Sequence, residues 1–133
     1  MIWQYFHRAG IPEYLARHYW WAYLWRPAIW FFNHPFIINL ILFGQYARLT
    51  AVTLRYLHRL PAARFLQIAC VYGKLIPTLA QADSFQEYHW IDIAKPQIEL
   101  ARKKLQNMQH SAHNMQNFAL MQAEKLAYRS DCM

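Results

Sequence analysis

The sequence predicts an α/β fold, and the prediction is based on two apolar runs and the stretch between them. Leu66–Gly73 ends in a tight turn, and His89–Ile93 carries an acid, Asp92, near its end. The intervening stretch, about Lys74 to Ala82, can form one helix. A strand, a tight turn, a helix and a second strand with an acid at its tip make the first half of a nucleotide-binding α/β unit. About three parallel strands with crossover helices are therefore expected.

The first part of the chain, residues 1–60, is predicted to be an aromatic, basic helical segment. Proline and an acid in the first turn favour a helix from Ile11 to Trp25, which Pro27 should end. A turn over residues 33–35 then precedes a long helix from Phe36 to about Leu60. This helix is expected to be amphipathic and basic.

The second part, residues 61–133, is predicted to be a partial nucleotide-binding domain. Its expected elements alternate between strands and helices in the order typical of a parallel sheet. They are a strand at 65–70, a helix at 74–82, a strand at 88–91, a helix at 97–106, a loop at 107–117 and a short strand at 117–121. A sheet of this size has few strands for a complete two-halved nucleotide-binding fold.

Charge and aromatic content both point to an anionic surface as partner. The net charge is +7 in 133 residues, and between Glu13 and Asp83 the sequence contains no acid. Aromatic residues make up 17% of the chain and crowd into its first half. Nucleic-acid binders interleave a few aromatics with many charges, so the crowding favours a membrane surface and argues against a nucleic-acid partner.

Three arginines in the expected long helix share one narrow arc. Arg48, Arg55 and Arg59 are spaced i, i+7 and i+11, which supports either phospholipid contact or an ordinary solvated face. Polar residues interrupt the apolar window from Pro27 to Ala47, so we interpret that window as interfacial or buried instead of membrane-spanning. The N-terminus shows no secretory signal.

Cysteine and histidine spacing gives no indication of a disulfide framework or a metal site. Cys70 and Cys132 lie far apart, which favours reduced thiols and a cytosolic setting. Cys70 is expected to be a small buried packing residue, since no base lies beside it in sequence. The seven histidines lack ligand spacing, so no metal is expected.

Two residues carry the expected nucleotide site. Gly73 permits close backbone approach to a ligand, and Asp92 follows it after 19 residues, near the interval of about 20 usual for a ribose-binding acid. Asp92 can accept hydrogen bonds from two ribose hydroxyls, or it can cap the helix that begins near Pro96.

Read in register, these segments resemble class I S-adenosylmethionine-dependent methyltransferases, a Rossmann-like family. Residues 66–73 resemble the first motif, residues 90–94 the ribose-binding strand end, residues 98–105 the following helix, and residues 123–126 with Asp131 the motif after the third strand. Three further segments, at residues 11–15, 19–23 and 38–49, together with residues 66–73, resemble the rhodoquinone-biosynthesis methyltransferase-like branch. The Cys-Val-Tyr-Gly turn at 70–73 is the most specific of these matches.

The resemblance implies S-adenosylmethionine as cofactor and a membrane quinone as substrate, with a ubiquinone methoxy group exchanged for an amino group. It also implies a cytoplasmic protein peripheral to the inner membrane of a bacterium. The cofactor-binding residues that it implies are Gln67, Ala69, Cys70, Tyr72, Gly73, Asp92, Ile93, Gln122 and Ala123. The residues expected to face the substrate or the membrane are Tyr19, Trp20, Tyr23, Tyr46, Arg48, Arg55 and Arg59.

The sequence also departs from the family pattern. Typical members have an acid at the position of Gln67 and glycines at those of Ala69 and Val71, and the rhodoquinone branch tends to an acid where this chain has Lys74. A cation there could repel the cofactor's sulfonium. The fourth and fifth strands of the family are also missing, which suggests a truncated product and leaves the strand at 65–70 with an unpaired edge.

Two functions follow from these observations. The first is a transferase of the rhodoquinone or ubiquinone type, with the choice between amino and methyl transfer, the quinone, metal dependence and oligomeric state left open. The second is an inactive relative that binds a membrane or a partner through residues 1–60.

Overall fold

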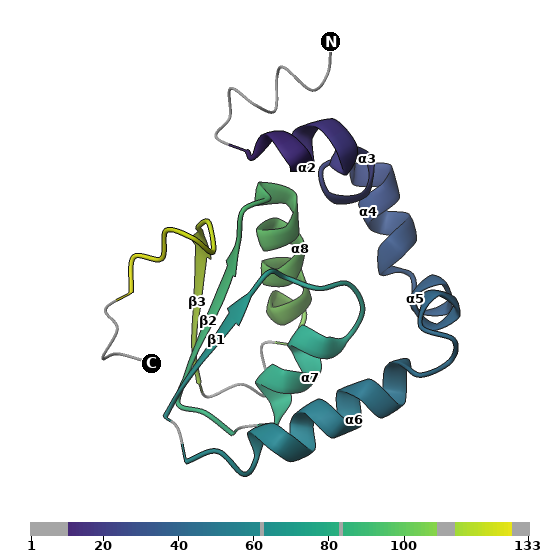
Figure 1. The fold of residues 1–133 in the computed structure, drawn as a ribbon. Coiled ribbons are helices and arrows are strands. Elements are labelled where there is room, and N and C mark those ends of the chain that lie inside the picture. Colours follow the sequence, from purple (N-terminus) through teal and green to yellow (C-terminus); the bar gives the residue numbers. More distant parts are fainter. Residues whose placement is uncertain (1–10, 62, 83, 109–113, 129–133) are drawn as a thin grey trace.

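The computed structural model describes residues 11–61, 63–82, 84–108 and 114–128. Helices and strands follow one another as a helical segment and then an alternating βαβαβ unit (Figure 1). In chain order the elements are α2 (Glu13–His18), α3 (Trp20–Tyr23), α4 (Arg26–Asn33), α5 (Pro35–Ile41), α6 (Tyr46–Leu57), β1 (Arg64–Ile68), α7 (Leu75–Gln81), β2 (Glu87–Asp92), α8 (Lys95–Gln106) and β3 (Met115–Leu120). The prediction of an α/β fold with three strands is confirmed.

The three strands form one parallel sheet in the order β1-β2-β3. The register places Gln67 beside Trp90 and Trp90 beside Phe118, so all three strands end at the same edge. Because α7 and α8 are the crossovers between successive strands, every connection returns to the opposite edge before the next strand begins. In the described part of the chain β1 pairs only with β2, so the expected free edge of β1 is confirmed.

The core lies between the sheet and the helices on one of its faces (Figure 1). Tyr88 and Trp90 are two positions apart on β2, so both side chains point toward this face. They are fully buried, and their rings stack with centroids 5.5 Å apart. Their polar atoms are satisfied, since the Tyr88 hydroxyl donates to the Leu79 carbonyl at 3.1 Å and the Trp90 indole donates to Gln116 at 2.7 Å. Burial of these two rings makes β2 the central strand of the core.

The first part of the chain is helical but more broken than predicted. The expected helix from Ile11 to Trp25 is two short helices, α2 and α3, that meet at Tyr19. The prediction that Pro27 ends a helix was wrong, because Pro27 lies in the first turn of α4. A proline lacks the N–H that a first turn leaves unpaired in any case, so it starts a helix as readily as it stops one.

The expected long helix from Phe36 to Leu60 is also two helices, and this prediction was wrong. Phe43 and Gly44 adopt left-handed backbone angles, with φ of 49° and 74°, and interrupt the helix between α5 and α6. The two helix axes differ by 86°. No single described helix is long and apolar enough to cross a membrane. The bent pair of α5 and α6, taken together, has the length and composition of a membrane-spanning segment.

Two expectations concern the end of the chain. The loop predicted to reach Asn117 ends earlier, because β3 begins at Met115. Asp131 and Cys132 lie outside the described residues, as do residues 1–10 and 109–113.

Candidate functional site

The carboxyl edge of the sheet borders a hollow of about 390 Å³. The ends of β1 and β2 form one wall, and aromatic side chains of the helical segment form the other. Its lining residues are Tyr14, Leu15, Tyr19, Tyr23, Ala69, Cys70, Val71, Tyr72, Asp92, Ile93 and Ala94. Seven of the residues expected from the sequence therefore lie around one space, although residues 19 and 92 are far apart in the chain.

A smaller hollow of about 150 Å³ adjoins the first and extends it toward the end of β3. The two hollows share Tyr14, Ala69, Asp92 and Ile93. Gln122 and Ala123, the last two expected cofactor residues, line the smaller hollow on the turn that follows β3. We refer to the two hollows together as the sheet-edge site.

Asp92 connects the tips of the two strands that border the sheet-edge site. Its Oδ2 accepts a hydrogen bond from the Cys70 N–H at 2.7 Å, and its Oδ1 accepts one from the Ala94 N–H at 2.8 Å. Only 8% of Asp92 is exposed, and burial raises the pKa of its carboxyl while these backbone N–H groups lower it. The helix α8 has Ala94 and not Asp92 as its N-cap residue, so Asp92 is not a helix cap.

Ala69 takes a backbone conformation that a side chain disfavours. Its φ is +69°, in the left-handed region that glycine adopts without steric cost. The position is one at which the resemblance led us to expect a glycine, and the chain has alanine there. The turn is held by neighbours, including the Ala69 N–H, which donates to the Ile91 carbonyl at 2.9 Å.

The turn after β1 is fixed from outside by the helical segment. The Gly73 N–H donates to Oδ1 of Asn33 at 3.1 Å, and the Lys74 N–H donates to the Tyr46 hydroxyl oxygen at 2.6 Å. Gly73 has φ of +82°, and a Cβ built on it would lie 2.5 Å from that hydroxyl oxygen. Glycine is thus required here because a side chain would clash with Tyr46. Contrary to the expectation, Gly73 does not line the sheet-edge site.

Tyr72 joins the same turn to the helices before it and to α8. Its hydroxyl donates to the Ala22 carbonyl and accepts a hydrogen bond from Gln97 at 3.0 Å. Its ring stacks on Tyr23 with centroids 6.3 Å apart and lies 6.0 Å from the ring of Phe32. Burial raises the Tyr72 pKa to about 12, so the hydroxyl stays protonated and can keep donating.

Like Gly73, Trp20 and Gln67 are expected site residues that do not line the sheet-edge site. Trp20 is half-buried within α3 and does not line either hollow. Gln67 lies on β1, where its side-chain N–H donates to the Ala69 carbonyl at 3.1 Å. The other amide atom of Gln67, Oε1, is buried and has no hydrogen-bond partner in the described part of the chain.

Lys104 makes a contact that sequence reasoning missed, because it follows Arg102 and Lys103 in a run of cations of the kind usually found on a solvated helix face. Its Nζ donates to the Gly73 carbonyl at 2.8 Å, and burial lowers its pKa to about 8. Cys70, a free thiol with 7% exposure, lies in the core cluster, and burial raises its pKa to about 12. Lys104 and Cys70 are close in space but far apart in the sequence, so the sequence could not predict their proximity.

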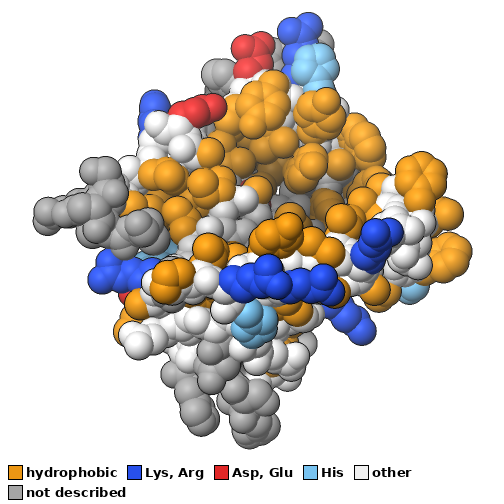
Figure 2. All heavy atoms as spheres, turned by 60° about the horizontal axis from the view of Figure 1, so that its bottom comes forward, with side chains coloured by type: hydrophobic (Ala, Val, Ile, Leu, Met, Phe, Trp, Pro, Cys, Tyr) orange, Lys and Arg blue, Asp and Glu red, His pale blue; other side chains and the backbone are white. Residues whose placement is uncertain are grey.

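The three arginines of the expected arc point away from the protein. Arg48, Arg55 and Arg59 are exposed and make no ion pair within the described ranges of the chain. Figure 2 shows a line of Lys and Arg side chains bordered by hydrophobic ones. We call the exposed side of α6 and the turn after it, with Arg48, Arg55 and Arg59, the arginine face; the exposed large apolar residues of α6 are Leu49, Val52 and Tyr56.

Comparison with known proteins adds no relative. No family model, no curated protein and no solved structure matches this chain. Among the residues that the structure describes, no three His, Cys, Asp or Glu side chains gather closely enough to hold a metal ion.

A pair of glycine substitutions separates backbone strain from packing at the turn. Gly44 has open space around it, so Gly44→Ala should cost only the left-handed strain, about 1 kcal/mol of unfolding free energy. Gly73→Ala adds a clash with Tyr46 and should cost at least about 2 kcal/mol. Urea unfolding of both variants measures the difference. Equal losses would contradict the packing role assigned to Gly73.

The lowered pKa of Lys104 predicts a dependence of stability on pH. Between about pH 8 and the ordinary value of 10.5 the unfolded chain binds a proton that the folded chain lacks, so stability rises with pH. The comparison is made from pH 7 to 9, because Cys70 titrates in the opposite sense above its ordinary value of 9.0. Urea midpoints should increase for the native chain, and Lys104→Met should remove most of that increase.

Proposed function

We propose that the protein is an S-adenosylmethionine-dependent transferase of quinone metabolism, similar to the enzyme that converts ubiquinone to rhodoquinone, at the cytoplasmic surface of a bacterial inner membrane. One observation carries the proposal. The strand ends and the turn that the family resemblance singled out border a single hollow at the carboxyl edge of a parallel sheet. Ligands of open α/β sheets bind outside the carboxyl ends of the strands.

The residues of the sheet-edge site fit the adenosine half of the cofactor. Each Asp92 oxygen accepts one backbone N–H, which leaves acceptor capacity on a carboxylate at the border of the hollow. Tyr14 and Ile93 supply apolar surface, and Gln122 lines the same hollow on the turn after β3. Asp92, Ile93 and Gln122 would therefore hold ribose and adenine.

The methionine half of the cofactor would lie at the turn after β1, where backbone N–H groups are already hydrogen-bonded within the protein. Asn33 and Tyr46 occupy the N–H groups of Gly73 and Lys74. Bound S-adenosylmethionine would supply an activated carbon on its sulfonium centre for a methyl transfer, or its α-amino group as the nitrogen source for an amino transfer. The chain's own contribution is to orient the nucleoside and to border it with the rings of Tyr19 and Tyr23, which limit access of water.

The arginine face supports the membrane location. Basic and apolar side chains on one exposed surface suit the boundary between anionic headgroups and acyl chains. A second candidate function, a membrane-binding module without transfer activity, is favoured by the occupied donors at Gly73 and Lys74.

Titration calorimetry with S-adenosylmethionine tests the cofactor. The native chain should bind it, and Ala123→Phe, which narrows the smaller hollow, should weaken binding about tenfold or more. The matched control Lys125→Phe places the same ring on the same turn outside the lining and should bind like the native chain. Absence of binding to the native chain would contradict the transferase proposal and favour the second candidate.

Sedimentation with vesicles tests the membrane contact. The native chain should bind phosphatidylglycerol-containing vesicles and release from them as salt increases. Replacing Arg48, Arg55 and Arg59 by Glu should abolish this binding. A control of equal charge change, with Lys95, Lys103 and Lys125 replaced by Glu, should keep most of it. Equal loss in both variants would show attraction by net charge only.

A further inference from the structure

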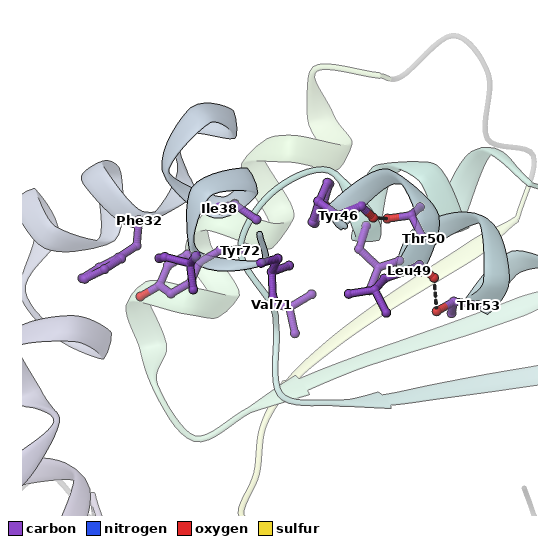
Figure 3. A pocket seen from close by; sticks show the side chains of 11 residues that line it. Phe32, Ile38, Tyr46, Leu49, Thr50, Thr53, Val71 and Tyr72 are labelled. Atoms are coloured by element: carbon purple, nitrogen blue, oxygen red, sulfur yellow. Dashed lines mark hydrogen bonds between the residues drawn. The ribbon is translucent and has the colours of Figure 1, made fainter. Parts of the chain in front are cut away.

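An apolar pocket of about 320 Å³ lies on the other side of the turn from the sheet-edge site. Helices α5 and α6 form one wall, and the turn between β1 and α7 forms the other (Figure 3). Its lining residues are Phe32, Ile38, Ile41, Leu42, Tyr46, Leu49, Thr50, Thr53, Val71, Tyr72 and Leu75. The pocket exceeds the apolar cavities of about 150 Å³ that are known to bind benzene.

The polar groups in this lining are bonded to the protein. The hydroxyls of Thr50 and Thr53 donate to carbonyls one turn back in α6, those of Tyr46 and Leu49, at 3.0 and 2.9 Å (Figure 3). The Tyr46 hydroxyl accepts from Lys74, and the Tyr72 hydroxyl is bonded to Ala22 and Gln97. A polar ligand would lose its hydrogen bonds with water here with few partners to replace them, whereas a hydrocarbon has no such bonds to lose and gains from leaving water.

The pocket opens beside the arginine face. Leu49 of α6 lines it and is 51% exposed, so it belongs to both surfaces, and Ile41 of α5, which also lines the pocket, is 52% exposed. On the inner side, Val71 and Tyr72 line both this pocket and the larger hollow of the sheet-edge site. The pocket therefore lies between the surface that suits a bilayer and the proposed cofactor site.

We infer that this pocket binds a single hydrocarbon chain of a membrane lipid, which enters from the bilayer between α5 and α6. The charge of the arginine face identifies an anionic bilayer as the source of the chain, a point that rests on the proposed membrane contact. The preference for a hydrocarbon rests only on the lining. A lipid held in this way places whatever group the chain carries near Val71 and Tyr72.

Displacement of the neutral fluorophore 1-aminoanthracene in lipid-free buffer tests the pocket. The native chain should bind the probe, and 1-decanol or geraniol should displace it. Their relative potencies distinguish an unbranched chain from an isoprenoid one. Thr50→Phe fills the pocket and should weaken binding about tenfold or more, whereas Ala51→Phe, one residue away and exposed, should leave it within about twofold.

A second filling variant, Thr53→Phe, repeats the test if Thr50→Phe does not fold, which far-ultraviolet circular dichroism decides. Failure of the native chain to bind the probe, or equal weakening by Thr50→Phe and Ala51→Phe, would overturn the inference. Vesicle sedimentation and S-adenosylmethionine titration of Thr50→Phe should match those of the native chain. If the native chain bound neither vesicles nor S-adenosylmethionine, that result would instead contradict the proposed function.

Discussion

The hydrogen bond from the Cys70 N–H to the Asp92 carboxylate is the constraint on which the candidate site depends. It joins the ends of β1 and β2 at the point where the ladder between them stops. The same carboxylate accepts the N–H of Ala94 and so also fixes the entry to α8. A charged acceptor shared by two backbone donors is stronger than a neutral one, and it holds the turn in place without a ladder.

The turn that follows Cys70 is then shaped by the helical segment as much as by the sheet. Asn33, Tyr46 and Tyr72 each reach across between the two parts of the chain. The aromatic content of the first half, which the sequence showed as a crowding of rings, is thus partly explained as packing around this turn. Other rings, such as those of Trp30 and Phe43, lie exposed on the surface.

The left-handed backbone angles of Phe43 and Gly44 bend the helical segment between α5 and α6. An uninterrupted helix would run past the sheet, whereas the 86° bend brings α6 back along the base of the molecule (Figure 1). That bend creates the apolar pocket against the β1 to α7 turn. The alignment of the three arginines follows from their i, i+7, i+11 spacing, and the bend brings the helix that carries Arg48 and Arg55 against the pocket.

Sequence alone determined the alternation of strands and helices, the parallel sheet and the position of Asp92 at a strand end, because these depend on local apolar patterns and on spacing along the chain. It also showed the acid-free basic segment around Arg48. Only the tertiary structure decided that Pro27 starts a helix, that Gly73 serves Tyr46, and that Lys104 meets the turn. The roles of Gly73 and Lys104 depend on which neighbours they meet after folding, and no local pattern records contacts between residues more than twenty positions apart. A proline can either start or stop a helix, so its position alone did not decide the role of Pro27.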